Sequence, residues 1–532
     1  MEEVGGRKYC VFALRKPTNW FRLCRNSFPP PFSLLPPTSS LLPAVKRGNM
    51  NSNTEEILLK FRNAKEAFEK LKIKQIKERT DLFKKLRQVI VDDLDNIVSV
   101  ICKETGKVKV EALASDMFPV LDTLNYFIKN LDKNLESKKI KSSSGDMCSV
   151  EYRPSGTAFI ISPWNFPFLL AFVPVLNAIA AGCSVILKPS ETTPETGKYI
   201  EILFQKAGFP ENGVQCIYGG AEVVQAAIRQ KPARVLFTGS TKTGREIGKL
   251  CGELLIPAVL ELGGKAPAII CGDADIERVS NAVIYGAFIN NGQICVAMSR
   301  ILIDAEIKEK FTAALVEKAG KIVLNRDYGR LIQPERIPYL KSLIDDAVGK
   351  GAKIIYKCEK SDEFLSPVII DNVTPEMRIF REECFAPAVC LTAYKSEEEA
   401  IALANDCDYG LAASIWAKDL KKAEKMSKYI TAGTIGINEW IKGVAEPALP
   451  FGGLKDSGYG RYHCDEGVQF FSDKISVLKS KSKNTSEINW LPYEPEMYED
   501  FKTAVLFLAG VKKIGPGVLK SLDKLKGRMK RK

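Results

Sequence analysis

The pattern of apolar and polar positions changes twice along this chain of 532 residues. From Asn53 to about Leu135, apolar residues recur every three or four positions with charged residues between them, which predicts amphipathic helices. A polar linker over Lys138–Cys148 and a short strand-like stretch, Val150–Arg153, follow. Beyond them, short apolar runs bounded by Gly, Pro and Ser alternate with helical stretches. This alternation is typical of a parallel sheet covered by helices, so the predicted fold class is α/β.

The first alternating region, 157–262, predicts strands with a helix between successive pairs. The expected strands are Thr157–Ile161, Ser184–Leu187, Gln215–Tyr218, Arg234–Phe237 and Ala258–Leu262. The expected helices are Phe168–Ala181, Glu195–Ala207, Val223–Arg229 and Gly244–Leu255. Parallel sheets bind ligands beyond the carboxyl ends of their strands. The loops expected to carry a site are therefore Ser162–Pro167, Lys188–Thr192, Thr238–Gly244 and Leu262–Pro267.

A second alternating region begins near Ala266 and predicts a second α/β domain. Its expected strands are Ile269–Ile270, Arg300–Ile303, Pro367–Ile370, Val389–Tyr394, Ser414–Trp416 and Thr434–Asn438. Its expected helices are Ile276–Asn290, Ile307–Gly320 and Glu397–Asn405. A late strand, Phe470–Val477, and a helix-like stretch, Tyr493–Gly510, complete the pattern.

The net charge of +13 lies in the two ends of the chain. Residues 1–49 carry eight Lys and Arg against two Glu, and residues 512–532 carry nine against one Asp, so the chain between them has a net charge of about −1. A nucleic-acid-binding protein needs a basic stripe on its folded part, so no nucleic-acid partner is expected. The Pro- and Arg-rich residues 1–49 are compatible with an organelle transit peptide, or with a disordered leader ahead of a start at Met50.

The basic C-terminal tail, 481–532, contains a mostly apolar run, Thr503–Val511. This run is too short to span a bilayer, which needs about 20 residues. Because basic residues follow it, it could lie on an anionic membrane surface as a peripheral contact. The alternative is a helix that docks on its own subunit or on a partner subunit.

Fourteen cysteines and a single histidine narrow the chemistry. The cysteines form no CxxC pair and no cluster with histidine, which argues against a zinc site or a disulfide framework and favours a reducing compartment. No metal site is therefore expected. Since His463 is the only histidine, most mechanisms with a histidine base are excluded, and a carboxylate or a lysine should do any acid–base work. His463 itself is expected to be structural.

Cys295 and Glu261 each lie beside a glycine turn. Cys295 ends the stretch Phe288-Ile-Asn-Asn-Gly-Gln-Ile-Cys295, and Glu261 precedes a Gly-Gly pair. A thiol and a carboxylate beside turns that expose backbone amides could serve as a nucleophile and its base. The alternative is that Cys295 is one more small buried apolar residue, the usual fate of a single cysteine.

Three loops of the first region carry further candidates. Asn165, held between two aromatic residues and a proline, offers a side-chain amide to an oxyanion, or forms an Asx turn. The loop Thr238–Arg245 opens a helix and favours an anion such as phosphate; it is not a Walker A loop, and a plain tight turn would also explain it. In Lys188–Glu191, the carboxylate can accept ribose hydroxyls, or the segment caps the following helix.

These motifs, in this order and spacing, resemble those of the aldehyde dehydrogenase superfamily from about residue 53 to 480. The resemblance rests on Pro163–Pro167, Lys188–Glu191, Phe237–Ser240, Leu260–Lys265, Asn291–Cys295, Glu382–Pro387 and Leu449–Gly453. It implies a Rossmann-like parallel-sheet cofactor domain, a second α/β catalytic domain and a small β element for bridging or oligomerisation. The implied boundaries are 1–49 leader, 50–261 cofactor domain with 138–153 in the bridging element, 262–438 catalytic domain, 439–480 return segment with a bridging strand, and 481–532 tail.

The resemblance also implies a reaction, the NAD-dependent oxidation of an aldehyde to a carboxylic acid, with NADP as a possible cofactor. Cys295 would attack the aldehyde, Asn165 and the Cys295 amide would hold the oxyanion, and Glu261 would activate the water that hydrolyses a thioester. The implied cofactor contacts are Lys188 and Glu191 for the adenosine ribose, Gly239 and Ser240 for the pyrophosphate, and Glu383 and Phe385 for the nicotinamide ribose and ring. The chain departs from the family pattern at Ala386, where the family has glycine.

Within the superfamily, the turn from Leu449 into Asp456–His463 and the C-terminal extension look most like the class 3-type enzymes for fatty and aromatic aldehydes. The stretch Asn291–Arg300 looks more like the semialdehyde and general branches. We therefore expect a medium- or long-chain aliphatic or aromatic aldehyde, and a homo-oligomer, with a dimer favoured. The expected location is cytoplasmic, with membrane association or organelle import as alternatives. A CoA-acylating dehydrogenase and a catalytically silent homologue are the alternative functions.

Overall fold

The computed structural model describes residues 52–142, 146–357, 365–511 and 515–529. The predicted leader, 1–49, lies outside the described residues. The described chain begins, as the periodicity predicts, with helices: α1 Thr54–Lys72, α2 Ile76–Asp92, α3 Leu94–Thr105, α4 Lys109–Ala112, a π-helical turn η1 Leu113–Met117, and α5 Phe118–Asn134. Their apolar positions form buried stripes; in α1, for example, Ile57, Phe61 and Ala64 are buried.

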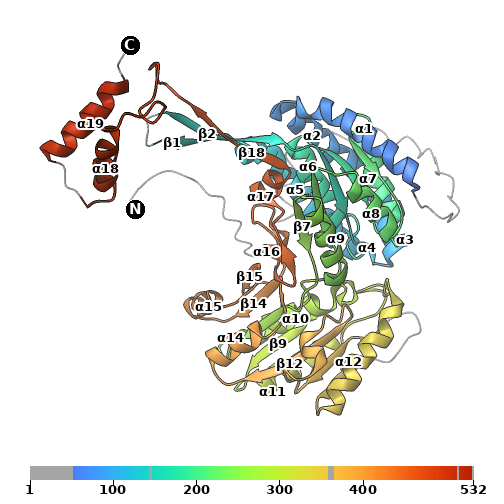
Figure 1. Cartoon of the computed structure of the whole chain (residues 1–532). Coiled ribbons are helices and arrows are strands. Elements are labelled where there is room, and N and C mark those ends of the chain that lie inside the picture. The colour runs from blue at the N-terminus through green and yellow to red at the C-terminus, as the bar shows by residue number, and fades with distance from the viewer. Residues whose placement is uncertain (1–51, 143–145, 358–364, 512–514, 530–532) are drawn as a thin grey trace, which may run out of the picture. The chain divides into compact units, whose positions relative to one another are not determined.

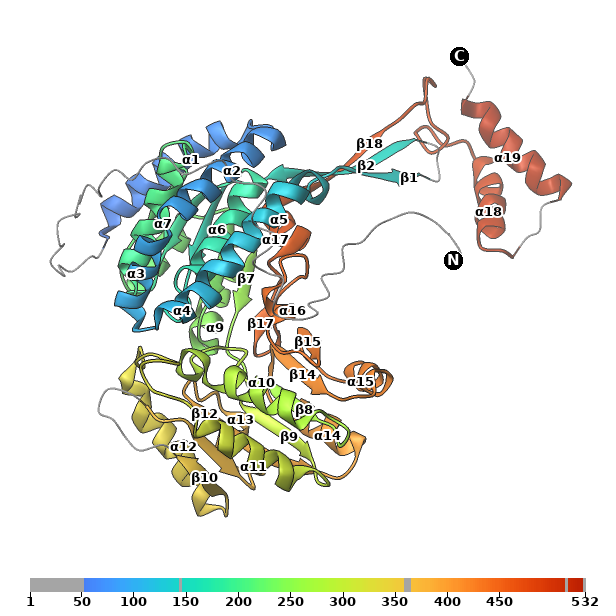
Figure 2. The ribbon, with the colours of Figure 1, turned by 180° about the vertical axis from the view of Figure 1, so that it is seen from behind.

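The first alternating region forms a six-stranded sheet in the order β17-β7-β6-β3-β4-β5. Its strands are β3 Thr157–Ile161, β4 Ser184–Lys188, β5 Val214–Cys216, β6 Arg234–Thr238, β7 Ala258–Glu261 and β17 Gly458–Tyr459. Its helices are α6 Leu169–Ala181, α7 Pro194–Lys206, α8 Ala221–Arg229 and α9 Thr241–Glu253. Figures 1 and 2 show the helices that cover this sheet, among them α1, α6, α7 and α9. Strand β17 had no predicted counterpart, and each of the other elements agrees with its own to within three residues. All strands except the antiparallel β17 are parallel.

Two hydrophobic cores enclose this sheet. One face packs against α1, α8 and α9 through a cluster that includes Phe61, Phe159 and Ile247. The other face packs against α6 and α7, which α2, α3 and α5 cover in turn. Every residue of β3 and β4 is buried, which explains why these strands are uninterrupted apolar runs rather than alternating ones.

The second region forms a seven-stranded sheet in the order β10-β11-β12-β9-β8-β14-β15. Its strands are β8 Pro267–Ile270, β9 Arg300–Asp304, β10 Lys353–Lys357, β11 Val368–Asp371, β12 Ala388–Tyr394, β14 Ala412–Trp416 and β15 Thr434–Ile437. Its helical segments are α10 Ile276–Phe288, η2 Ile289–Gly292, α11 Lys308–Ala319, η3 Pro334–Arg336, α12 Ile337–Gly349, α13 Arg378–Arg381, α14 Glu397–Asn405, α15 Leu420–Ser427 and α16 Lys442–Ala445. Of these, β10, η3, α12, α13, α15 and α16 had no predicted counterpart, and β10 is antiparallel to β11.

The helix predicted over Ile276–Asn290 ends at Phe288 instead. Asn290 and Asn291 have left-handed backbone angles, with φ of 50° and 56°. Asparagine tolerates this conformation better than most residues, so the pair ends the helix and turns the chain toward Cys295.

A small antiparallel sheet, in the order β1-β2-β18, joins segments far apart in the sequence (Figure 1). Its strands are β1 Lys138–Lys141, β2 Met147–Pro154 and β18 Ser472–Lys479. The expectation of a linker over Lys138–Cys148 is therefore wrong at both ends of that segment, which belong to β1 and β2. Pairing between the strands orders this polar segment, although its sequence does not alternate between apolar and polar residues.

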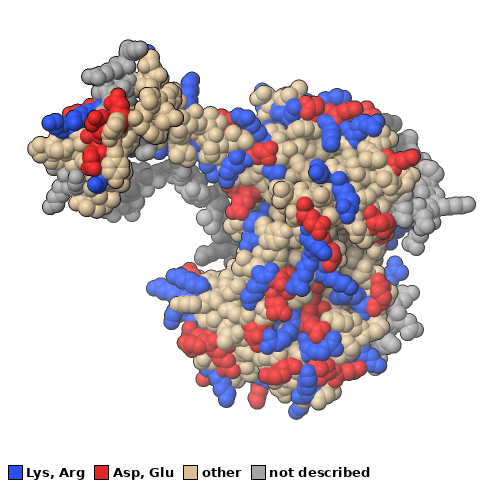
Figure 3. Space-filling view, viewed as in Figure 1, with Lys and Arg blue, Asp and Glu red and all other residues tan. Residues whose placement is uncertain are grey.

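Short elements complete the described chain: β13 Tyr409–Gly410, β16 Leu454–Lys455, α17 Cys464–Phe470, α18 Met497–Leu508 and α19 Pro516–Met529. α18 replaces the longer predicted helix, and α19 was not predicted. Within the described ranges, no helix is both long and apolar enough to cross a membrane. On the face drawn in Figure 3, basic and acidic side chains are interspersed, as the near-neutral charge of the chain between its two ends implies.

Candidate active site

Four predicted site residues lie at one edge of the first sheet. The parallel strands β7, β6, β3 and β4 are neighbours in that order, and their carboxyl ends carry Glu261, Ser240, Asn165 and Lys188. The chain leaves β3 for β4 on one side and returns to β6 on the other. This is the switch point at which open α/β sheets form a ligand crevice. The prediction that these loops converge is thus consistent with the strand order.

The Cys295 loop contacts one turn at this edge and one loop of the second sheet. A Cβ added at Gly264 would lie 2.1 Å from the carbonyl oxygen of Cys295, so the Gly-Gly turn after Glu261 touches the backbone of Cys295. A Cβ added at Gly292, where φ is +66°, would lie 2.4 Å from the carbonyl oxygen of Ala386. Glycine at both positions allows three backbone segments to meet around the thiol.

Asn165 is buried and reaches the same loop. Its side-chain Nδ2 donates to the carbonyl of Gln293 at 2.9 Å. The Asn290 side chain donates to the Asn165 carbonyl at 2.9 Å and to the Gln293 carbonyl at 3.3 Å. An amide nitrogen carries two protons, so Asn165 has a second N–H for a substrate oxygen while the first fixes its orientation.

Glu261 is buried, and neither of its carboxylate oxygens has a hydrogen-bond partner. Burial raises the pKa of Glu261 well above its usual value, and the charge of Arg461 acts in the opposite direction. A carboxylate with a raised pKa and unused acceptor atoms is suited to take and return a proton near neutral pH.

Cys295 is half-buried and a free thiol. Burial raises its pKa to about 12, and the negative charges of Glu383 and Glu261 add to the rise. Hydrogen bonds from the backbone amides of Cys295 and Val296 act in the opposite direction. The thiol therefore stays protonated at neutral pH in the free protein, and a base must remove its proton when it attacks.

Glu383 and Phe385 lie on the loop between α13 and β12 of the second sheet. Glu383 Oε1 accepts a hydrogen bond from the amide of Gly264 at 2.8 Å, and burial raises its pKa to about 7. Phe385 has a φ of 52° and packs edge-to-face on Trp164, with ring centroids 5.4 Å apart. The loop after α13 thus contacts both the Gly-Gly turn and the loop of Asn165.

The predicted cofactor residues of the first sheet also pair locally. Lys188 is buried and its Nζ donates to Glu191, which is exposed, at 2.8 Å. Ser240 caps α9, accepting from the Thr243 amide at 3.2 Å. A helix N-terminus with free backbone amides favours a phosphate.

Unpaired polar atoms at this edge fit a dinucleotide. Ser162 Oγ, Thr238 Oγ1 and both oxygens of Glu261 are buried without a partner, and each lies at or just after the carboxyl end of a strand. Unpaired buried polar atoms are costly, and a bound ligand commonly satisfies them. Lys188 and Glu191 would hold a ribose, Ser240 and the start of α9 a pyrophosphate, and Glu383 a second ribose.

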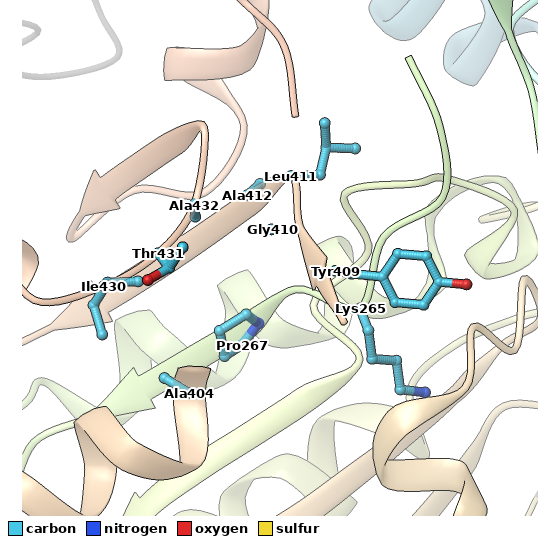
Figure 4. A pocket seen from close by; sticks show the side chains of 10 residues that line it. All are labelled: Lys265, Pro267, Ala404, Tyr409, Gly410, Leu411, Ala412, Ile430, Thr431 and Ala432. Carbon is cyan, nitrogen blue, oxygen red and sulfur yellow. The ribbon is translucent and has the colours of Figure 1, made fainter. Parts of the chain in front are cut away.

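A small cavity nearby is not the substrate site. It measures about 10 Å³, close to the minimum that one water molecule needs. Figure 4 shows the side chains that line it, with the charged end of Lys265 pointing away from Ala404 and Ala412.

Sequence reasoning missed several residues that act on the site. Arg461 opposes the rise in the Glu261 pKa, and the buried ring of Tyr462 lies close enough for Glu261 and Cys295 to raise its own pKa. Nothing in their spacing distinguishes them from ordinary surface or core residues. His463 is buried, burial lowers its pKa to about 4, and its Nδ1 has no partner. In the described ranges, no three His, Cys, Asp or Glu side chains gather as a metal site requires.

Comparison with known proteins agrees with this geometry. The sequence model of the aldehyde dehydrogenase family matches residues 46–477. A 4,4'-diapolycopene aldehyde oxidase of Methylomonas sp is 37% identical over 443 residues, 82% of this chain and 84% of that protein. A 4,4'-diaponeurosporen-aldehyde dehydrogenase of Staphylococcus aureus is 31% identical over 445 residues, 82% of this chain and 96% of that protein.

Solved structures give the same assignment. The aldehyde dehydrogenase of Mycobacterium tuberculosis in complex with NAD+ has a TM-score of 0.77 and 30% identity, covering 81% of this chain and 91% of that one. The predicted fold class is confirmed. The conclusion from motifs, geometry and comparisons is that this chain belongs to the aldehyde dehydrogenase family.

Proposed function

We propose that this protein oxidises an aldehyde to a carboxylic acid with NAD or NADP, through a thioester on Cys295. The observation that carries the proposal is the meeting of segments at Cys295: the Gly-Gly turn after Glu261 touches the Cys295 backbone, and the Cys295 loop accepts a hydrogen bond from the Asn165 side chain. Nucleophile, base and oxyanion donor are thus supplied by three separate segments.

The chain's own groups account for the steps around the cofactor. The thiol sulfur bonds to the aldehyde carbon while its proton passes to Glu261, and the resulting oxyanion accepts from the Asn165 side chain and the Cys295 amide. Bound NAD(P)+ supplies the oxidant, since it accepts the hydride from that carbon. Glu261 first releases the thiol proton to solvent and then takes a proton from water as the water attacks the thioester. The sulfur–carbon bond breaks, the Cys295 thiolate takes that proton back from Glu261, and the acid leaves.

We infer that the substrate is a lipophilic aldehyde, of medium or long aliphatic chain or with an aromatic group. Two relatives are named for a 4,4'-diapolycopene aldehyde and a 4,4'-diaponeurosporen-aldehyde, which supports an apolar substrate. The class 3-type assignment stays a prediction. A CoA-acylating reaction is disfavoured because Glu261 provides a base for water, whereas a thiol acceptor needs none so placed.

A substrate panel tests this proposal. We expect reduced cofactor to form with lipophilic aldehydes, in larger amounts than with short or charged ones, in parallel assays with NAD and NADP. Cys295→Ala should abolish turnover, while Cys251→Ala, a control at a buried cysteine of α9, should not. Normal turnover by Cys295→Ala contradicts the mechanism, and a product that forms only with CoA contradicts hydrolysis.

We further propose that the C-terminal segment binds an anionic lipid surface. Large apolar and aromatic side chains are exposed along it: Trp490, Leu491, Tyr493, Tyr498, Val505, Leu508, Val511 and Leu519. In α18, Tyr498, Val505 and Leu508 share one face at spacings of seven and three. The exposed Lys520 and Lys524 of α19 and the net charge of +8 over 512–532 complement anionic headgroups.

Vesicle co-sedimentation tests the lipid contact. The full chain should sediment with phosphatidylserine-containing vesicles more than with pure phosphatidylcholine, and less at high salt. Val505→Asp with Leu508→Asp should remove the binding, while Leu255→Asp, at a residue that is 90% exposed in the turn after α9, should not. Equal binding by the double variant, or a loss of oligomers without a loss of vesicle binding, contradicts the proposal.

A further inference from the structure

Three buried charged residues outside the catalytic set lie on the segment that links α3 to α5. Lys107 Nζ and Asp116 Oδ2 are 2.6 Å apart, and both side chains are inaccessible to solvent. Glu111 lies between them in the sequence and is also buried. Removing charges from water costs free energy. The contacts of these three residues therefore indicate which parts of the structure they hold in place.

One side of this cluster holds the loop of Asn165. Lys107 Nζ lies 3.9 Å from the ring centroid of Phe166, a cation–π contact with the residue next to Asn165. Asp116 Oδ1 accepts from the Leu169 amide at 3.2 Å, at the first residue of α6. The cluster therefore holds the loop at Phe166, next to Asn165, and at Leu169, where α6 begins.

The other side holds the loop of Cys295. The Glu111 carboxylate accepts a hydrogen bond from the backbone amide of Asn290, the left-handed residue that ends α10. Asn290 in turn donates to the carbonyls of Asn165 and Gln293. Glu111 is thus two hydrogen bonds away from the Asn165 backbone carbonyl. The Asn290 side chain also shares the Gln293 carbonyl with the Asn165 side chain.

We propose that Glu111, supported by Lys107 and Asp116, is a positioning residue that sets the oxyanion donor of Asn165 against the Cys295 thiol. The cluster bonds to each of the two loops and the loops bond to each other, so a shift in one changes the distance between donor and nucleophile. A displacement of about 1 Å can lower a rate about 100-fold. This inference rests on the proposed aldehyde oxidation.

Two readouts separate positioning from general structural support. In Glu111→Ala, the rate of the first-turnover burst of NADH at saturating cofactor should fall about 10²-fold, as it does when an enzyme loses an oxyanion donor. Alkylation of Cys295 by iodoacetamide forms no oxyanion, so its rate should stay within about threefold of wild type. Glu111→Gln keeps an acceptor for the Asn290 amide and should restore most of the burst.

Glu201→Ala is the matched control, because Glu201 also accepts from a buried backbone amide, that of Cys216 at 3.1 Å, at the far strand β5. It should leave both rates unchanged. A burst in Glu111→Ala within threefold of wild type, or a parallel fall of burst and alkylation, overturns the inference. If Glu111→Ala does not fold, two other results overturn the inference. One is a burst rate in Glu111→Gln as low as that in Asn165→Ala. The other is a wild-type burst rate in Asp116→Asn protein whose thermal midpoint is unchanged. Wild-type protein that forms no NADH contradicts the proposed function, not this inference.

Discussion

Glu261, at the end of β7, combines burial with two unpaired carboxylate oxygens. Hydrogen-bond partners would hold the carboxylate ionised and lower its pKa, but only the charge of Arg461 opposes the desolvation. The group can therefore exchange protons with the thiol and with water without first breaking a hydrogen bond. Burying the carboxylate without partners destabilises the folded protein, and it also makes the carboxylate a stronger base.

Replacing this carboxylate should separate the two halves of the reaction. In Glu261→Gln, the thioester should form more slowly, because the thiol proton must pass to solvent instead of to Glu261. It should then persist, because no base activates the water. Rapid-mixing assays should show up to one equivalent of NADH followed by a steady state at least about 10²-fold slower than wild type. Mass spectrometry should find the acyl group on Cys295. Wild-type turnover, or a burst after which Cys295 carries no acyl group, would show that Glu261 is not the hydrolytic base.

Glu383 provides a pH-dependent contact. Its pKa of about 7 means that the group is neutral below pH 7 and ionised above it. An ionised carboxylate accepts ribose hydroxyls more strongly than a neutral one, by roughly 1 kcal/mol or five- to tenfold in affinity. NAD should therefore bind more tightly as the pH rises from about 6 to about 8, measured by fluorescence titration of Cys295→Ala protein.

The neighbouring carboxylate gives a matched control. In Glu383→Gln the pH dependence should disappear, whereas in Glu382→Gln it should persist. The hydrogen bond from Arg378 lowers the pKa of Glu382, so Glu382 does not titrate in this range. The same pH dependence in Glu383→Gln as in wild type would assign it to another group.

At the scale of elements, the sequence predicted buried elements better than irregular ones. β3 and β4 are apolar runs bounded by turn residues, and their predicted bounds differ from the structure by at most one residue. α12 was missed although Leu340, Leu343 and Ala347 are buried at helical spacing, because the surrounding residues are polar. β1 had no local signal, since its order comes from pairing with β2.

The candidate site shows the same limit. Motifs predicted Cys295, Glu261 and Asn165, and the structure connects their loops. Glu111 could not be found, because a Glu on an amphipathic helix is usually solvated. Only the long-range contact with Asn290 distinguishes it. The assignment of Lys188, Glu191, Gly239, Ser240, Glu383 and Phe385 to the cofactor stays a prediction.

The Gly-Gly turn tests how closely these elements must fit. Gly264→Ala would place a Cβ 2.1 Å from the Cys295 carbonyl oxygen, so one of the two backbones must move. We expect kcat to fall about 10²-fold or more, since the thiol loop is displaced, and the unfolding free energy to fall by about 1–3 kcal/mol.

Gly252→Ala is the control for this substitution. Gly252 is in α9 with nothing within 4 Å of the added Cβ, so alanine should stabilise the helix by about 0.5–1 kcal/mol. Denaturant unfolding and initial rates of both variants measure the contrast. Full activity in Gly264→Ala would show that the loop adapts without cost to the chemistry.

At the scale of the whole molecule, the small sheet offers an assembly surface. The strand registers pair Ile140 with Cys148 and Cys148 with Leu478, so the three side chains form a row on one face. Ile140 and Leu478 are 51% and 62% exposed. An exposed apolar row on a sheet favours contact with another protein surface, and we propose that it contacts a second copy of this chain, in a homodimer.

Substitutions along β18 test this assembly, because alternate residues of a strand point to opposite faces. Leu478→Lys, alone or with Ile140→Lys, should convert the dimer into monomer in size-exclusion chromatography with light scattering, since a charge buried in an apolar interface costs several kcal/mol. Val477→Lys introduces the same charge on the opposite face and should leave the dimer intact. If Val477→Lys dissociates the protein and Leu478→Lys does not, the interface lies on the other face, and the cross-strand row is merely a solvent-exposed surface.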